Sequence, residues 1–209
     1  DPLTGAGCSG GGATAVSWSP DGRTIASGGE DSHVRFWDVD KGIETNFWEH
    51  PEYVGISTVA WSPDGGQLAI GDWAGHVWVG DAATQEIVAD WAAHEDSVTR
   101  VSWSPDGTEL ATSSRDTSVR IWDPLTGSQL QEFTGNTTEV VEDVTWSPDG
   151  QQVASAGQDA LLRVWQRSSG EQQWQKEHST PALSAAWSPA GFPLVSGGYD
   201  GELFFWDAA

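Results

Sequence analysis

The 209-residue chain is poor in the residues that cross-link proteins, span bilayers or bind anions. It contains no methionine, one cysteine (Cys8) and two lysines (Lys41 and Lys176). A lone cysteine cannot form a disulfide within the chain, and no apolar run approaches the ~18–20 residues that a transmembrane helix needs. The start, Asp1, is not a translation start and does not resemble a signal peptide. We therefore expect a cytoplasmic protein, either processed or taken from a longer one, without a membrane span.

Basic residues are scarce as a class, because 31 acidic side chains face only nine basic ones and the net charge is −22. Phosphate backbones and anionic bilayers bind through lysine and arginine, so we expect neither nucleic acid nor membrane as a partner. The sequence is not that of a disordered acidic chain, since it has 14 tryptophans and 37% hydrophobic residues. Its 25 glycines and ten prolines favour short strands joined by tight turns.

What the sequence has instead is an internal repeat. The string W-S-P-D-G begins at Trp18, Trp61, Trp103 and Trp146, and W-S-P-A-G begins at Trp187, with spacings of 43, 42, 43 and 41 residues. A second landmark follows 19 residues after each: Trp37-Asp38, Gly80-Asp81, Trp122-Asp123, Trp165-Gln166 and Trp206-Asp207. Two landmarks that keep one phase over five units indicate a repeat architecture.

Each repeat alternates apolar and polar residues with the period of a β-strand. In the third repeat this predicts strands over 98–103, 109–112, 118–122 and 129–133, joined by hairpin turns. A single twisted four-stranded sheet has two apolar faces and cannot bury both by itself. Stacking such sheets around an axis buries them, and this is the β-propeller architecture.

The period, the W-S-P-D-G turn and the terminal W-D resemble the WD-repeat family over nearly the whole chain. The resemblance implies an all-β fold, a β-propeller of five four-stranded antiparallel blades, in a single domain over residues 1–209. The expected blade cores are about 12–40, 55–83, 97–125, 140–168 and 181–209, with the outer strands between them. It leaves open whether five blades close alone or belong to a larger ring, and an open ring would favour self-association.

The first residues suggest how the last blade is completed. Asp1–Gly5 repeats the string Asp123–Gly127 that follows the third W-D tryptophan. In the family, one terminus commonly supplies the missing outer strand for the blade at the other end. We therefore expect Asp1–Cys8 to pair beside Glu202–Trp206.

The resemblance also implies a buried polar relay in each blade, in which a His, a Ser or Thr, the tight-turn Asp and the W-D Trp hydrogen-bond in series. The expected members are Ser27, Asp31 and Trp37; His94, Thr112, Asp116 and Trp122; Ser155, Asp159 and Trp165; and His178, Ser196, Asp200 and Trp206. The second repeat keeps His50 but has Ile70, Ala74 and Gly80 at the other positions. A partly satisfied network costs stability, so we expect the second blade to be the least stable.

These sets contain the residue types of a catalytic triad, but they recur at a fixed phase in several repeats, which favours a structural role. The histidines lack metal-ligand spacing, the acidic clusters lack a calcium-loop pattern, and Gly10–Gly12 is not followed by the lysine of a phosphate loop. We therefore predict that the chain is not an enzyme and has no metal or cofactor.

The remaining function is surface recognition. In WD-repeat proteins the binding face is formed by the residue before each tight-turn Asp and by positions early in the innermost strand. Carried onto this chain, the predicted face is Glu30, Ser57, Trp73, Thr99, Arg115, Glu142, Gln158, Leu183 and Tyr199. Trp73, Arg115 and Tyr199 are of the types that dominate binding energy, although Trp73 is equally compatible with core packing.

We accordingly predict a non-catalytic scaffold that binds a basic or neutral peptide or protein segment on one propeller face. One alternative is a sensor or regulatory propeller segment of a larger signalling protein linked to an ATPase or kinase. A lectin with one sugar site per blade is less favoured, because the exposed positions differ between repeats. The sequence leaves the oligomeric state and the identity of the partner open.

Overall fold

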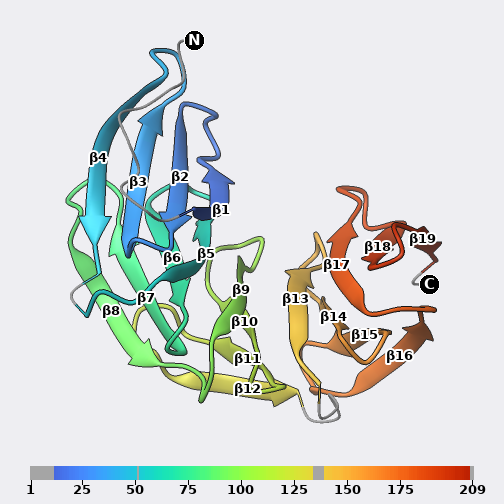
Figure 1. The fold of residues 1–209 in the computed structure, drawn as a ribbon. Coiled ribbons are helices and arrows are strands. Elements are labelled where there is room, and N and C mark those ends of the chain that lie inside the picture. Colours follow the sequence, from blue (N-terminus) through green and yellow to red (C-terminus); the bar gives the residue numbers. More distant parts are fainter. Residues whose placement is uncertain (1–11, 51, 134–138, 208–209) are drawn as a thin grey trace. The chain divides into compact units, whose positions relative to one another are not determined.

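The structure, a computed structural model, describes residues 12–50, 52–133 and 139–207. These residues form β-strands, turns and connecting segments and contain no helix (Figure 1). The strands form five antiparallel sheets, which we number as blades 1 to 5 in chain order. The chain divides into two compact units, residues 1–101 and 102–209, and each is described by itself.

The strands of each blade follow one another along the chain and pair with their sequence neighbours. Blades 1 and 2 consist of β1 (Ala13–Trp18), β2 (Thr24–Gly29), β3 (His33–Asp38) and β4 (Ile43–Glu49), then β5 (Ile56–Trp61), β6 (Gln67–Asp72), β7 (His76–Asp81) and β8 (Ile87–Ala92). Blades 3 and 4 consist of β9 (Val98–Trp103), β10 (Leu110–Ser114), β11 (Val119–Trp122) and β12 (Gln129–Phe133), then β13 (Val141–Trp146), β14 (Gln152–Gly157), β15 (Leu161–Gln166) and β16 (Gln172–Glu177). Blade 5 consists of β17 (Ala182–Trp187), β18 (Leu194–Gly198) and β19 (Leu203–Trp206).

The expected strands of the third repeat agree with β9 to β12 to within two residues. The all-β fold of repeated antiparallel sheets is confirmed, with one difference in strand number. Blade 5 has three strands among the described residues, whereas the sequence predicts four. The segment predicted to provide the fourth strand, Asp1–Cys8, lies outside the described residues.

The W-S-P-D-G motif is a turn held by its own side chains. In the first copy, the Ser19 hydroxyl donates to Asp21 Oδ1 over 2.6 Å, and the same carboxylate oxygen accepts from the Arg23 amide. Gly22 has a φ of 70°, in the left-handed region that glycine adopts without strain. The Ser–Asp bond recurs at 2.6 Å in Ser62–Asp64, Ser104–Asp106 and Ser147–Asp149. The motif is therefore explained by local hydrogen bonding.

Within each unit, successive blades pack through their apolar faces. We call the face that bears the W-S-P-D-G tryptophan the entry face and the opposite face the exit face. In the first unit, Val34 and Phe36 on the exit face of blade 1 pack with Ile56, Val59 and Trp61 on the entry face of blade 2. All of these except Trp61 are at most 7% exposed.

The second unit repeats this arrangement twice. Val119 and Ile121 of blade 3 pack with Val144 and Trp146 of blade 4. Leu162 and Val164 of blade 4 pack in turn with blade 5. Burying side chains of this size contributes about 1.5–3 kcal/mol each. The core therefore consists of layers between blades.

An outer-strand aromatic completes two of these layers, and in both its size matches the residue that it meets. In the second unit, Phe133 stacks on Trp165 with ring centroids 5.3 Å apart. In the first unit, the larger Trp48 lies where a Cβ on Gly80 would come within 2.5 Å of its ring. Blade 2 therefore lacks the W-D tryptophan at Gly80 because the side chain of Trp48 occupies that space.

The second blade also retains a buried polar network, which the sequence analysis did not anticipate. Asp72 is fully buried, and its Oδ2 lies 3.1 Å from His50 Nε2. Its Oδ1 accepts from the backbone amides of Ala74 and His76, which is the usual task of the tight-turn Asp. The carboxylate has thus moved two residues towards the N-terminus. The premise that blade 2 lacks a satisfied network is wrong.

We predict that Asp72→Ala lowers the free energy of unfolding by about 3 kcal/mol, because it leaves buried His50 and two turn amides without their acceptor. Urea unfolding followed by tryptophan fluorescence measures the change. Asp40→Ala, an exposed carboxylate, is the matched control, with an expected change within about 0.5 kcal/mol. Equal effects of the two substitutions would contradict the assigned role of Asp72.

Candidate functional site

The predicted face residues lie at the tight-turn end of each blade, where one backbone hydrogen bond recurs. The Trp73 amide donates to the Gly55 carbonyl over 3.1 Å, and the Tyr199 amide donates to the Pro181 carbonyl over 3.0 Å. The same bond joins Glu30 to Gly12 and Gln158 to Val140. In four blades, this hydrogen bond therefore holds the residue before the tight turn next to the start of the first strand of the blade.

The side chains at this end differ from blade to blade, although the backbone is the same. In the first unit, Trp73 is 46% exposed, and its ring lies over Gly55, where a Cβ would come within 2.7 Å of it. This contact fixes the indole without burying it. Glu30 is exposed, whereas Thr99 is half-buried and the Ser57 hydroxyl is used locally, donating to the Gly71 carbonyl.

In the second unit, Tyr199 is 77% exposed and Arg115 is also exposed. Gln158 Nε2 donates to Glu142 Oε1 over 2.6 Å, so these two face residues hold each other. Leu183 is 40% exposed on the innermost strand β17. The second unit therefore presents an aromatic ring, a guanidinium, a carboxylate–amide pair and an apolar side chain at this end of its blades.

Below the tight turns, the Trp–Ser/Thr step of the polar relay is present in four blades. The indole Nε1 donates to the hydroxyl of the second strand at 2.7–3.1 Å in Trp37–Ser27, Trp122–Thr112, Trp165–Ser155 and Trp206–Ser196. In blade 5 the series extends to His178, whose Nε2 lies 2.7 Å from Ser196 Oγ. Because Ser196 accepts from the indole, its own proton is free to go to His178.

In blades 1, 3 and 4, the tight-turn carboxylate has an arginine partner that the sequence analysis missed. Asp31 accepts two bonds from Arg35, and Asp159 forms an ion pair of 2.6 Å with Arg163. In blade 3, Arg120 lies 3.7 Å from Asp116. The arginine always stands two residues before the W-D tryptophan. In the sequence, this recurrence is the signal that could have revealed the pair.

Blades 2 and 5 have an aromatic residue at the position of that arginine. Trp78 meets His50 edge-on with centroids 4.6 Å apart, and Phe204 meets His178 in the same way at 4.6 Å. In blade 5, Asp200 therefore has no arginine opposite it and accepts from the Ser179 hydroxyl over 2.7 Å. The loop end of a blade is thus fixed either by an Asp–Arg pair or by a His–aromatic contact.

The geometry of blade 5 is that of a structural network rather than a catalytic triad. His178 Nδ1 has no hydrogen-bond partner, so Asp200 does not orient the ring as a triad carboxylate would. Ser196 is only 1% exposed, which keeps its hydroxyl from any substrate.

Among the described residues, no group of three or more His, Cys, Asp or Glu side chains is placed to hold a metal ion. The described part of the chain also has no helix that could cross a membrane.

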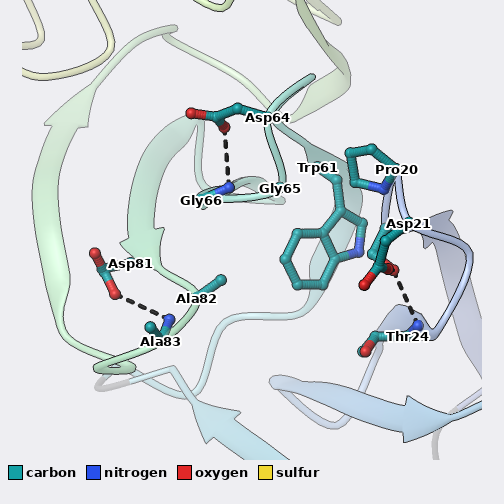
Figure 2. Close-up of a pocket in the computed structure, with 11 residues that line it drawn as sticks. Pro20, Asp21, Thr24, Trp61, Asp64, Gly65, Gly66, Asp81, Ala82 and Ala83 are labelled. Carbon is teal, nitrogen blue, oxygen red and sulfur yellow. Dashed lines mark hydrogen bonds between the residues drawn. The ribbon is translucent and has the colours of Figure 1, made fainter.

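At the other end of the strands, the W-S-P-D-G turns of blades 1 and 2 enclose a hollow of 390 Å³ (Figure 2). Trp61 and Pro20 contribute apolar surface to it, and Asp21, Asp64 and Asp81 line it. Hydrogen bonds from the Ser19 and Ser62 hydroxyls lower the pKa of Asp21 and Asp64, and bonds from Thr84 lower the pKa of Asp81. All three carboxylates are therefore ionised at neutral pH.

The second unit has an equivalent hollow of 440 Å³ between the turns of blades 3 and 4. There the chain supplies its own cation, because the Arg167 guanidinium makes a bidentate ion pair with Glu109. The residues aligned with this pair in the first unit are Thr24 and Ala82. The first hollow is thus more acidic than the second.

Repeated antiparallel sheets, layered through apolar faces and bearing variable side chains at one loop end, define the chain as a β-propeller protein. A sequence model described as "WD domain, G-beta repeat" matches residues 3–38, 85–123, 127–166 and 171–207. The model of the anaphase-promoting complex subunit 4 WD40 domain matches residues 47–103. The chain belongs to the WD-repeat family.

Among solved structures, the chain is similar to one in the crystal structure of a mitotic checkpoint complex, with a TM-score of 0.84 and 26% sequence identity. The match covers 94% of this chain and 60% of the other, so this chain spans less than two thirds of the length of that relative. A search of curated protein sequences gives no significant match.

We predict that His178 makes stability depend on pH near neutrality. Burial lowers the pKa of His178 below its usual value of 6.5, against the raising effect of Asp200 and Glu202. As the pH falls below about 6.5, the unfolded chain takes up the proton first, so the free energy of unfolding decreases and levels off below the folded-state pKa. Urea titrations at pH 7.5 and pH 5 measure the change. His178→Gln should reduce it, and an unchanged pH dependence in this variant would contradict the assignment.

Proposed function

We propose that the chain is a non-catalytic scaffold that binds a peptide or protein segment at the tight-turn end of its blades. The observation that carries this proposal is the backbone bond repeated in blades 1, 2, 4 and 5, which holds two variable positions side by side at that end. A rigid backbone with non-repeating, exposed side chains suits recognition of one irregular partner better than several identical ligands.

Three side chains are the proposed anchors, namely Trp73 in the first unit and Arg115 and Tyr199 in the second. Aromatic rings lose little conformational entropy on binding, and arginine forms directional bonds with carbonyls and carboxylates. Trp73 is additionally pre-positioned by its contact with Gly55. The other proposed face residues are Glu30, Ser57 and Thr99 in the first unit and Glu142, Gln158 and Leu183 in the second unit.

The charge of the chain favours a basic or neutral partner. The net charge is −22, and several of the few cations are used internally, including Arg35, Arg163 and Arg167 in ion pairs. An uncompensated negative field accelerates the approach of a basic partner, at a rate that falls as salt screens it. We infer no nucleic-acid partner for the same reason.

The comparisons support protein partners as a class. The related chain of known structure is described in a mitotic checkpoint complex, and the family model that matches residues 47–103 is that of an anaphase-promoting complex subunit. Both descriptions concern multi-protein assemblies. They favour a scaffold over a lectin, and they are compatible with the alternative of a regulatory propeller segment in a larger signalling protein.

The proposal is tested with a peptide selected from a displayed random library on the wild-type chain and then measured by calorimetry. We predict that Tyr199→Ala and Arg115→Ala each weaken its binding at least tenfold, because they remove exposed anchors, while the melting temperature changes little. Leu125→Ala is the matched control. This residue is 61% exposed in the β11–β12 turn, at the opposite end of the strands. Loss of binding in the control, or equal loss of binding and stability in the anchors, would contradict the proposal.

A further inference from the structure

One exposed aromatic residue at the tight-turn end of the first unit is explained neither by packing nor by backbone preference. Tyr53 lies in the connection between β4 and β5, and it is 74% exposed. Its φ is 57°, in the left-handed region that a bulky side chain rarely adopts. The ring therefore gains little from burial, and the backbone that carries it is strained.

The repeat does not account for Tyr53 either. Among the described residues, five non-glycine residues have a positive φ, and four of them occupy turn positions that are glycine in another blade, namely Ser32, Gln85, Thr117 and Ala160. His50 stands 11 residues before the W-S-P-D-G tryptophan of its blade, whereas His94 and His178 stand nine residues before theirs. Tyr53 thus lies in a connection that is longer than its counterparts, outside the repeated turns.

A buried pair joins this connection to the tight turn that carries Trp73. His50 Nε2 lies 3.1 Å from Asp72 Oδ2. His50 also fixes the connection, because its Nδ1 accepts from the Glu52 amide over 3.0 Å and its carbonyl accepts from the Tyr53 amide over 3.1 Å. Since Nδ1 accepts, the ring proton is on Nε2 and is donated to Asp72. One hydrogen-bond network therefore holds the segments on either side.

The tight turn of blade 2 is fixed on its side of this network. Asp72 Oδ1 accepts from the Ala74 amide directly after Trp73, and the Trp73 amide donates to the Gly55 carbonyl over 3.1 Å. Gly55 follows Tyr53 by two residues. Two exposed aromatic side chains, of which Tyr53 is 74% and Trp73 is 46% exposed, therefore stand on segments that are bonded to each other.

Two exposed carboxylates belong to the same region. Glu52 directly precedes Tyr53, and its side chain is exposed. Glu30 is exposed at the tight turn of blade 1, and the connection lies against that turn through a 2.8 Å bond from the His50 amide to the Ser32 carbonyl. The face of an aromatic ring attracts a cation, and a carboxylate adds to this attraction. The chemistry that fits this region is a cationic side chain.

We propose that Tyr53 is a specificity-determining residue of the binding face, and that it receives an arginine or lysine side chain of the partner segment together with Trp73. Glu30 and Glu52 supply the opposite charge. This inference rests on the proposed function, and it names the chemistry that the first unit recognises. It also gives a function to an exposed ring on a strained backbone.

The test uses the full chain and the peptide selected on the wild type, with binding measured by calorimetry. Tyr53→Asn should weaken binding about fivefold or more, because it removes the ring. The urea midpoint should not fall, since asparagine adopts a left-handed φ more readily than tyrosine. Tyr53→Phe keeps the ring and should bind within about twofold of the wild type.

Gln85→Asn is the matched control for the change in backbone strain. Gln85 is exposed, has a φ of 65° and lies in the β7–β8 turn of the same unit, at the opposite end of the strands. The substitution makes the same change towards asparagine without removing a ring from the binding face. We expect it to leave binding unchanged, and a loss equal to that of Tyr53→Asn would overturn the assignment.

A double-mutant cycle identifies the group that Tyr53 receives. Each arginine or lysine of the selected peptide is replaced in turn by glutamine, and each peptide is measured against the wild type and Tyr53→Asn. For one basic residue the two substitutions should be coupled about threefold or more, because the ring and the cation then act as one contact. A selected peptide without a basic residue, or a cycle without coupling, overturns the inference.

The outcomes separate this inference from the proposed function on which it rests. If Arg115→Ala and Tyr199→Ala weaken binding and Tyr53→Asn does not, the inference is overturned and the proposed function stands. If the library gives no binder, or if none of these substitutions weakens binding, both are overturned. A fall in the urea midpoint of Tyr53→Asn that parallels its loss of binding assigns Tyr53 a structural role and also overturns the inference.

Discussion

Apolar packing between the faces of successive sheets is the interaction on which the rest of this structure depends. A four-stranded sheet offers two apolar faces, and within each unit a blade buries such a face against a neighbouring blade that presents a complementary set. Val34 and Phe36 against blade 2, and Val119 and Ile121 against blade 4, are instances of one rule.

Polar groups inside the blades determine the position of the loops rather than the existence of the sheets. The Trp–Ser/Thr bonds and the Asp–Arg pairs lie at the loop end, where they fix turns that carry exposed side chains. In blade 2, Asp72 accepts the turn hydrogen bond that the tight-turn Asp accepts in other blades, and it also contacts His50. The turn therefore needs a carboxylate with hydrogen-bond partners, but this carboxylate can stand at a different position in the sequence. A buried polar network is stable when every member has a partner, and this condition can be met in more than one way.

The variable side chains of the candidate face stand on this invariant frame. Trp73 and Tyr199 share the same backbone bond and the same place in their blades, yet their surroundings differ. The division between a repeated interior and an irregular surface is what allows a scaffold to recognise one partner. In the proposed function, the acidity of the chain acts over a longer range than these contacts, because a negative field attracts a basic partner before any contact forms.

The sequence by itself determined the strands, the turns and the repeat, because these follow from local patterns such as the Ser–Asp bond of W-S-P-D-G and the alternation of apolar residues. It also indicated which positions lie at the loop end of each blade. The replacement of the second relay by Asp72, the filling of the Gly80 position by Trp48 and the pairing of Arg35 with Asp31 emerged only from the tertiary structure. Each depends on which side chains from separate strands or blades meet in space, and that is decided by packing between sheets.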